Sequence, residues 1–160
     1  MMRTVDRLTI HQPPARVYQL AAAIERWPVL LPHYRWVTRQ SGMPGGAGVV
    51  EMAAWRPFGP LRWPTWWQSE MTTDPVAQRV TYRHVAGITR GMAVLWTIEA
   101  TPEGWSDVTI VHEWSGPRWP LIGSLVAAAI IGPVFVHGIA SRTLRGLARA
   151  ADMPPSAVTG

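Results

Sequence analysis

The feature that most constrains the fold is a change in hydrophobic period along the chain. Between residues 13 and 27 apolar side chains recur three or four positions apart, as in a helix, whereas between residues 34 and 114 they recur at every second position. Short sequences rich in Gly, Pro and Asp divide this second stretch into strand-like segments. The predicted strands are Tyr34–Gln40, Val49–Trp55, Leu61–Met71, Arg79–Val85, Met92–Ala100 and Val108–Trp114. Because the links between them are short, these strands predict an antiparallel meander.

The N-terminal part of the chain adds one strand and two helices. Thr4–Ile10 is rich in β-branched residues and predicts a further strand. A Pro-Pro pair at residues 13–14 suits the first turn of a helix, and Pro28 and Pro32 bound a second short helix, with Trp27 at the join. We therefore expect two short helices between the first strand and the meander.

A long helical region from Pro120 to Ala151 closes the chain, with a break at Gly132-Pro133. The predicted fold is α+β: a curved antiparallel sheet of seven strands wrapped around a long C-terminal helix. Strong curvature would leave a gap between sheet and helix, and that gap would be a ligand cavity. We expect residues 3–151 to form a single ligand-binding domain and residues 152–160 to be a flexible tail.

The composition excludes several kinds of chemistry. The chain has no cysteine, so a disulfide framework and a cysteine metal site are impossible. All fifteen cationic residues are arginines, which excludes Schiff-base chemistry and lysine-dependent phosphate loops. The histidines lack the spacing of metal ligands, so we expect neither a metal nor a cofactor. Ten tryptophans against two phenylalanines favour apolar walls that also meet something polar, because the indole carries an N–H donor.

Two segments bear on membranes and nucleic acids. Arg142, Arg145 and Arg149 form a stripe at helical spacing, which we interpret as a solvated helix face rather than a site for nucleic acid or lipid headgroups. The segment Leu121–Ala140 is long and apolar enough for a membrane span, but its Gly132-Pro133 break fits a buried or lid-forming segment as well. The N-terminus lacks the apolar run of a signal peptide, so we expect a cytoplasmic protein.

The layout and several motifs resemble the START/Bet v 1-like helix-grip (SRPBCC) superfamily, in particular its polyketide cyclase/dehydrase and lipid-transport branch. The motifs are "IERWP" at residues 24–28, "LPHY" at residues 31–34, the hairpin sequence "GMAVLWTIEATPEGWSDVTIVHEW" and the helix end "SRTLRGLARAAD". The resemblance implies a cavity for a hydrophobic, often aromatic, molecule between the sheet and the long helix. Some relatives fold and dehydrate polyketide chains, whereas others carry lipids or quinones without chemistry. Fold alone does not choose between these functions.

Strand alternation selects the candidate catalytic residues. It groups His84 with Val80 and Tyr82 on one apolar face, and it groups His112 with the apolar residues of the last strand. An imidazole titrates near neutral pH, so either histidine could move protons during aldol cyclisation and dehydration. Each could equally be a core histidine satisfied by hydrogen bonds. The resemblance adds Tyr34, which matches a position that cyclases of this family use near the cavity mouth.

The candidate ligand-binding residues are mostly aromatic. They are Trp27, Trp66, Trp67, Glu70, Tyr82, Trp96, Trp114 and Phe135. Alternation puts Trp66 and Trp67 on opposite faces of the strand Leu61–Met71, and the sequence leaves open which face is inward. The resemblance also implies an inward arginine on this strand, but none is present; depending on register, Gln68, Glu70 or Thr72 takes its place.

Three functions follow as hypotheses. The first is a polyketide cyclase/dehydratase-like enzyme, in which His84 or His112 moves protons. The second is a non-catalytic carrier of a lipid, a quinone or an aromatic metabolite. The third is a membrane-associated protein anchored through residues 121–140. The expected partner is a hydrophobic or aromatic small molecule and not a nucleic acid, with peripheral membrane contact and a homodimer left open.

Overall fold

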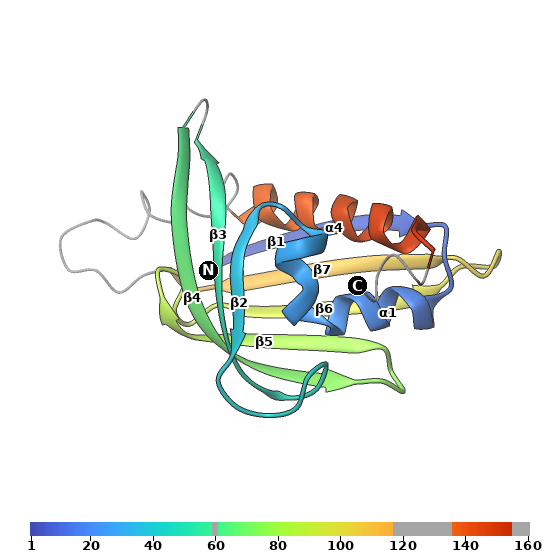
Figure 1. The fold of residues 1–160 in the computed structure, drawn as a ribbon, viewed down its shortest axis with the longest axis horizontal. Helices are drawn as coiled ribbons and strands as arrows, with labels where there is room; N and C mark the ends of the chain where they lie inside the picture. Colours follow the sequence, from blue (N-terminus) through green and yellow to red (C-terminus); the bar gives the residue numbers. More distant parts are fainter. Residues whose placement is uncertain (59–60, 117–135, 155–160) are drawn as a thin grey trace.

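The computed structural model describes residues 1–58, 61–116 and 136–154, and seven antiparallel strands form one sheet within them. The order across the sheet is β1-β7-β6-β5-β4-β3-β2. The strands are β1 (Met2–Ile10), β2 (Tyr34–Arg39), β3 (Gly48–Phe58), β4 (Leu61–Asp74), β5 (Arg79–Gly87), β6 (Ala93–Ala100) and β7 (Ser106–Trp114). Strands β2 to β7 form the predicted meander, and the sheet curves strongly (Figure 1).

The first strand lies far from the second. β1 pairs with β7 at one edge of the sheet, while β2 forms the other edge. The chain between them crosses the sheet through α1 (Pro14–Ala22), the 3-10 helix η1 (Ile24–Arg26) and α2 (Trp27–Leu30). Prolines stand in the first turns of α1 and α2, where the missing N–H is not needed. The predicted pair of short helices is therefore confirmed, with one turn of 3-10 helix between them.

Helix α4 (His137–Asp152) lies along the concave side of the sheet and contacts β1, β3, α1 and α2 (Figure 1). Its apolar face is buried, and Arg142, Arg145 and Arg149 are exposed, as the interpretation of a solvated stripe requires. The helix ends at Asp152, one residue beyond the predicted domain boundary. The predicted break at Gly132-Pro133 and most of the segment 121–140 lie outside the described residues. Within the described ranges, no helix has the length and apolar character needed to cross a membrane.

The curvature is greatest at the β3–β4 hairpin. β4 pairs with β5 only from Trp67 onward, so its first residues have β3 as their one neighbour among the described strands. Pro64 lies in that part, where a strand tolerates a residue without an N–H on its open side. Gly87 ends β5 with φ +91°, and a Cβ there would stand 2.4 Å from the Trp66 carbonyl oxygen. Glycine is needed here because β5 approaches the β4 backbone this closely, in a conformation that other residues rarely adopt.

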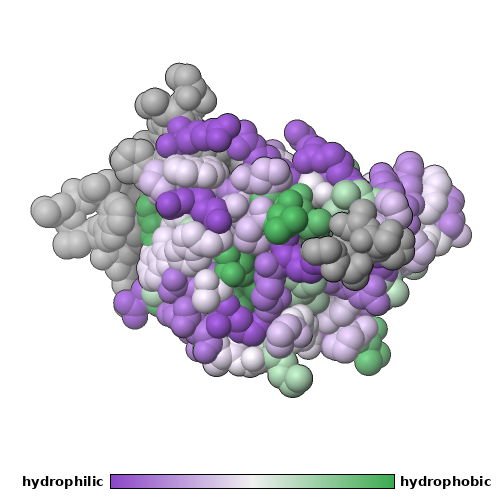
Figure 2. Space-filling model, viewed as in Figure 1, coloured by the Kyte–Doolittle hydropathy of each residue, from purple (hydrophilic) through white to green (hydrophobic). Residues whose placement is uncertain are grey.

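The face of the molecule shown in Figure 2 is mainly hydrophilic, with strongly hydrophobic residues in small separate patches. The exposed large apolar side chains come from different elements; they include Val29, Val76, Trp66 and Trp105. Neither the predicted homodimer nor the predicted peripheral membrane contact is tested by this surface, and both stay predictions.

Candidate functional site

A cavity of about 70 Å³ lies between the concave face of the sheet and helix α4. Most of its wall is apolar, and the polar residues in the wall are few. It is lined by Trp27, Tyr34, Met52, Trp67, Tyr82, His84, Thr89, Met92, Val94, Trp96, Ile110, His112, Val136, Ile139, Ala140 and Thr143. A mostly apolar pocket with a few convergent polar groups is typical of a small-molecule site.

The strand register brings two of the candidate catalytic residues into this cavity with Tyr82. Tyr82 pairs with Val94 on β6, and Val94 pairs with His112 on β7, so these three side chains form one row across the inner face. His84 follows Tyr82 two positions along β5 and therefore lies on the same face. The alternation predicted for β5, β6 and β7 is confirmed by their burial patterns.

His84 is held in place from two sides. Its ring stacks on Trp67, with 5.9 Å between the ring centroids, and its Nδ1 lies 2.6 Å from the Thr89 hydroxyl oxygen. Burial, together with the nearby His112, lowers the pKa of His84 to about 3. The imidazole is therefore neutral at pH 7, and its Nε2 has no hydrogen-bond partner among the described residues. A neutral ring can donate or accept one hydrogen bond there, according to its tautomer.

His112 is half-buried and has a weaker anchor. Its Nδ1 lies 3.5 Å from the hydroxyl oxygen of Thr4, which is its partner in the β1–β7 ladder. Burial lowers its pKa to about 4. Both histidines of the cavity wall are thus neutral near pH 7. Protonation of one would make protonation of the other less favourable, because the two positive charges repel each other.

Tyr34 is buried and reaches the cavity wall from the start of β2. Its ring packs against Trp27, with 5.1 Å between centroids, and against the edge of Trp67 at 6.3 Å. Its hydroxyl lies 3.4 Å from the hydroxyl oxygen of Thr143 on α4, and that oxygen also lies 2.9 Å from Nε2 of His33. Burial raises the pKa of Tyr34 to about 12, so the hydroxyl is protonated at pH 7.

Tyr82 presents a hydroxyl without a partner. The side chain is buried, and its oxygen makes no hydrogen bond with the described residues. Burial raises its pKa well above the ordinary value for tyrosine. A buried hydroxyl in this state is free to donate a hydrogen bond to a ligand oxygen.

The predicted tryptophans divide between the cavity and other places. Trp27, Trp67 and Trp96 line the cavity, and Trp27 also donates from Nε1 to the Leu20 carbonyl at 3.1 Å, which ties α2 to α1. Trp114 is buried but lies outside the cavity wall, since its indole donates to the Arg90 carbonyl at 3.0 Å. Trp114 therefore occupies a core position next to the β5–β6 turn, and its role in ligand binding stays a prediction. Phe135 lies outside the described residues.

Trp66 and Glu70 do not line the cavity formed by the described residues. Both are exposed, because the inner face of β4 carries Trp67, Ser69 and Met71. Of the alternatives for the missing arginine, Gln68 and Thr72 also belong to the outer face, and Ser69 occupies the inward position between Trp67 and Met71. Ser69 is completely buried, and its hydroxyl has no partner among the described residues.

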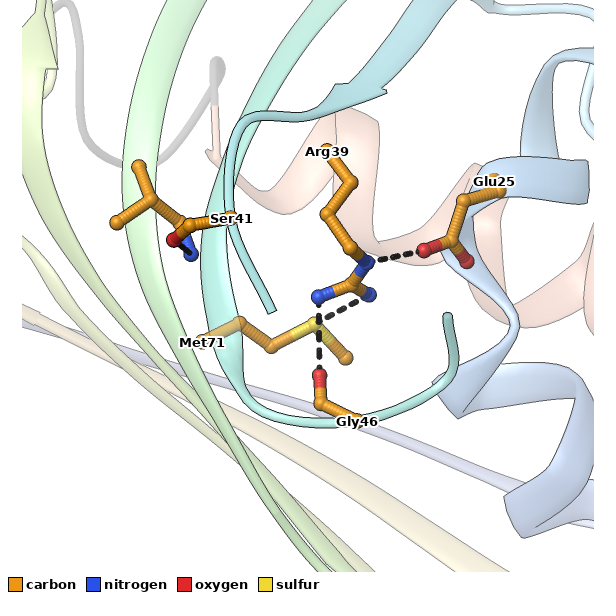
Figure 3. A network of polar contacts seen from close by, with 6 residues as sticks. Glu25, Arg39, Ser41, Gly46 and Met71 are labelled. Carbon is orange, nitrogen blue, oxygen red and sulfur yellow. Dashed lines mark hydrogen bonds and ion pairs between the residues drawn. The ribbon is translucent and has the colours of Figure 1, made fainter. Parts of the chain in front are cut away.

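Sequence reasoning missed a buried arginine on the edge strand β2. Arg39 of β2 donates from Nε to the Glu25 carboxylate at 2.5 Å and from Nη1 to the Gly46 carbonyl at 3.1 Å (Figure 3). Its Nη2 contacts the Met71 sulfur at 3.9 Å. The guanidinium therefore joins η1, the β2–β3 loop and the inner face of β4. All of its described contacts are within the protein, and it does not line the cavity.

A second missed pair connects β1 with the start of α4. The Asp6 carboxylate, buried on the inner face of β1, contacts Nδ1 of His137. Burial is the main cause that raises the pKa of Asp6, and His137 opposes it. Among the residues that the structure describes, His, Asp and Glu side chains form no group of three or more that could hold a metal ion.

Comparison with known proteins places this site in a family context. A family model described as polyketide cyclase/dehydrase and lipid transport matches residues 10–134. No curated protein sequence matches the chain. Three solved structures share the fold at low identity. The Zhui aromatase/cyclase from Streptomyces sp. R1128 has a TM-score of 0.79 at 14% identity, with 94% of this chain and 93% of that chain covered.

The other two come from different sources. The protein TTHA0849 from Thermus thermophilus has a TM-score of 0.77 at 18% identity, with 99% of each chain covered. The ginseng major latex-like protein 151 from Panax ginseng has a TM-score of 0.67 at 13% identity, with 95% of this chain and 97% of that chain covered. At these identities the likeness shows the helix-grip fold, and it confirms the resemblance seen in the motifs.

Proposed function

The chain belongs to the polyketide cyclase/dehydrase and lipid-transport family, and from this membership we propose that it binds a hydrophobic, aromatic small molecule in the cavity and promotes its aldol cyclisation and dehydration. The observation that carries the proposal is the position of His84 and His112, two neutral imidazoles in one cavity wall that is otherwise mainly apolar and aromatic. The solved Zhui aromatase/cyclase, whose fold the chain shares, supports this class of reaction.

The proposed chemistry needs one base and one hydrogen-bond donor. One imidazole accepts a proton from the carbon between two carbonyl groups, and the enolate formed attacks a second ketone carbon of the same chain. The new alkoxide takes the proton back. A second α-proton and the hydroxyl group then leave as water, so that a carbon–carbon double bond forms and no proton is consumed. The Tyr82 hydroxyl or the other imidazole stabilises the enolate oxygen by donating a hydrogen bond.

A carrier function is the second candidate, and one observation favours it. General acid–base catalysis works best when the pKa of the group is near the working pH, and both histidines have pKa values several units lower. In a carrier, the same neutral rings and the Tyr82 hydroxyl would only orient the polar end of a lipid, a quinone or an aromatic metabolite.

The test supplies a linear poly-β-ketone thioester and follows loss of water by mass spectrometry and formation of the aromatic product by absorbance. We expect His84→Gln and His112→Gln each to lower kcat/KM by about 100-fold or more, because one lost proton-transfer group typically costs that factor. The matched control is His11→Gln; His11 is exposed, stacks on Trp105 and should leave the rate unchanged.

The outcomes separate the two functions. Turnover that both cavity variants retain at the wild-type rate would contradict the catalytic proposal. Binding without turnover in the wild type, with a ligand that co-purifies and is identified by native mass spectrometry, would support the carrier. Absence of both binding and turnover would contradict both.

Three further statements stay predictions from the sequence. They are the expected cytoplasmic location and the two possibilities that the sequence leaves open, a homodimer and a peripheral contact with membranes. Fractionation of cells and sedimentation of the purified protein with and without lipid vesicles would check them.

A further inference from the structure

The turn between β5 and β6 brings a buried hydroxyl to the ring of His84. Thr89 lies in this turn, is 3% exposed and lines the cavity. Its hydroxyl oxygen lies 2.6 Å from Nδ1 of His84 and makes no other hydrogen bond with the described residues. Because buried polar groups are normally paired, and this one has a single side chain as its partner, the contact serves the placement of His84.

The backbone of the turn fixes the place of Thr89. Its carbonyl accepts from the Met92 N–H at 3.0 Å, and the Arg90 N–H donates to the Gly87 carbonyl at 3.1 Å. The indole of Trp114 donates to the Arg90 carbonyl at 3.0 Å, which ties the turn to β7. The hydroxyl of Thr89 is therefore held by a turn that is hydrogen-bonded within itself and to a third strand.

The ring of His84 is supported at its face and at one nitrogen. It stacks on Trp67, with 13° between the two ring planes. Stacking alone would permit the imidazole to make half a turn about its Cβ–Cγ bond, because the ring plane is the same in both orientations. The hydrogen bond between Thr89 and Nδ1 exists in only one of them. Thr89 therefore selects one orientation, in which Nε2 is the nitrogen left for a molecule in the cavity.

A hydroxyl is suited to this place because it can bond to Nδ1 in every protonation state of the ring. It donates to an unprotonated Nδ1 and accepts from a protonated one. Thr89 can therefore keep its contact with either neutral tautomer of His84, and also with a ring that has taken up a proton at Nε2. His112 has a weaker support, since its Nδ1 lies 3.5 Å from the Thr4 hydroxyl oxygen.

We propose that Thr89 is a positioning residue for His84: its hydroxyl holds the imidazole in one orientation by Nδ1 and so keeps Nε2 available to the substrate. The inference rests on the proposed function, because it gives Thr89 a part in the proposed proton transfer. Thr89 itself exchanges no proton with the substrate. Loss of its hydroxyl should therefore slow the reaction without preventing it.

The first measurement compares two pairs of side chains at position 89 that differ in the hydroxyl. Thr89→Val replaces the hydroxyl by a methyl group of similar size, and Thr89→Ala differs from Thr89→Ser only by the hydroxyl. With the linear poly-β-ketone thioester, we expect Thr89→Val and Thr89→Ala to lower kcat by about five- to tenfold, the value of about one hydrogen bond, and to change KM by less than about twofold. Thr89→Ser should keep kcat near the wild-type value.

The matched control is a buried threonine hydroxyl outside the cavity wall. Thr65 donates to the Ala54 carbonyl at 2.9 Å and does not line the cavity. Thr65→Val removes a comparable hydrogen bond from the sheet, so it should lower the stability but leave kcat unchanged. An equal fall of kcat in Thr65→Val and Thr89→Val would show that lost stability is the cause, and would overturn the inference.

The second measurement observes the ring of His84 in the ligand-free protein. 15N NMR at pH 7, with histidine labelled in the ring, reports the protonation and hydrogen bonding of each ring nitrogen. The His84 signals are those that disappear in His84→Gln. We expect Thr89→Ser and Thr65→Val to keep the wild-type positions of Nδ1 and Nε2, and Thr89→Val and Thr89→Ala to shift them. A merely structural role of Thr89 would not move these signals.

The remaining outcomes separate the inference from the proposed function. Turnover with the same kcat in the wild type, Thr89→Val and Thr89→Ala would overturn the inference alone. Signals of the His84 ring that neither variant shifts would do the same. Absence of turnover in the wild type would contradict the proposed catalytic function and, with it, the part given to Thr89.

Discussion

At the scale of single residues, two buried hydroxyl groups on the inner face of the sheet have no hydrogen-bond partner among the described residues. They belong to Tyr82 and Ser69. An unsatisfied buried hydroxyl costs about 1–3 kcal/mol of stability. Tyr82 lines the cavity, so a ligand oxygen can remove this cost on binding. The protein without ligand is therefore less stable at this position than an apolar side chain would make it.

Tyr82→Phe tests that statement. We expect the free energy of unfolding of the ligand-free protein to stay unchanged or to rise by about 1 kcal/mol, because the change removes a polar group that has no partner. Thr65→Val is the matched control: the buried Thr65 hydroxyl donates to the Ala54 carbonyl at 2.9 Å, and its loss should destabilise by about 0.5–1.5 kcal/mol. Urea unfolding measures both, and a clear loss of stability in Tyr82→Phe would show that its hydroxyl is satisfied.

At the scale of elements, Arg39 joins η1, the β2–β3 loop and β4 (Figure 3). Its side chain is 8% exposed, whereas that of Glu25 is 29% exposed. A buried ion pair gives little net stability, but removal of one partner leaves the other charge without compensation. Arg39 therefore holds the end of the β2–β3 hairpin against the short helices as long as both charges are present.

Arg39→Met should lower the free energy of unfolding by about 2–3 kcal/mol, less than for a fully buried pair, because Glu25 keeps some contact with water. In the double variant with Glu25→Gln the loss should be smaller than the sum of the two single losses. The exposed pair Arg3–Glu113 is the control, and Arg3→Met should cost less than about 1 kcal/mol. Additive losses at Arg39 and Glu25 would contradict the coupling.

At the scale of the whole molecule, three histidines tie stability to pH. The pKa of His84 is lowered to about 3, and those of His33 and His112 to about 4, mainly by burial. In the unfolded chain a histidine titrates near 6.5. Between these values the unfolded chain binds protons that the folded protein does not bind, so the stability is full above about pH 6.5 and is lost as the pH falls toward 4.

Each of these histidines should lower the free energy of unfolding by up to about 1.4 kcal/mol per pH unit within that window. The pKa of Asp6 is raised mainly by burial, so this residue changes the stability with pH in the direction opposite to the histidines. A comparison between variants is therefore more decisive than the overall dependence of stability on pH. In His84→Phe the change of the free energy of unfolding per pH unit between about pH 6 and pH 4.5 should be smaller than in the wild type by the contribution of one histidine. Urea unfolding across this range is the measurement, and equal slopes in the wild type and His84→Phe would contradict the lowered pKa.

Local sequence patterns were enough to predict the elements and the faces of three strands. Alternation correctly placed Tyr82, His84, Trp96 and His112 on the inner side, because β5, β6 and β7 keep a strict period of two. The order of segments and the motifs around Trp27 were sufficient for the helix-grip fold. These properties depend on local periodicity and on turn residues, and a single sequence shows both.

The remaining parts of the site depend on tertiary packing. The register of β2 shifts between Tyr34 and Trp36, so Arg39 shares the inner face with Tyr34, whereas strict alternation from Tyr34 would have placed it outside. On β4 the sequence was equally compatible with Trp66 or Trp67 inward, and packing against Tyr34 and His84 selected Trp67.

The link from His33 through Thr143 to Tyr34 joins side chains 109 and 110 positions apart in the chain. A bulge reverses the faces of a strand, and a contact of this range depends on how helix and sheet pack. Neither leaves a trace in local periodicity, and so the tertiary structure alone decided the position of Arg39 and the contacts of Tyr34 with helix α4.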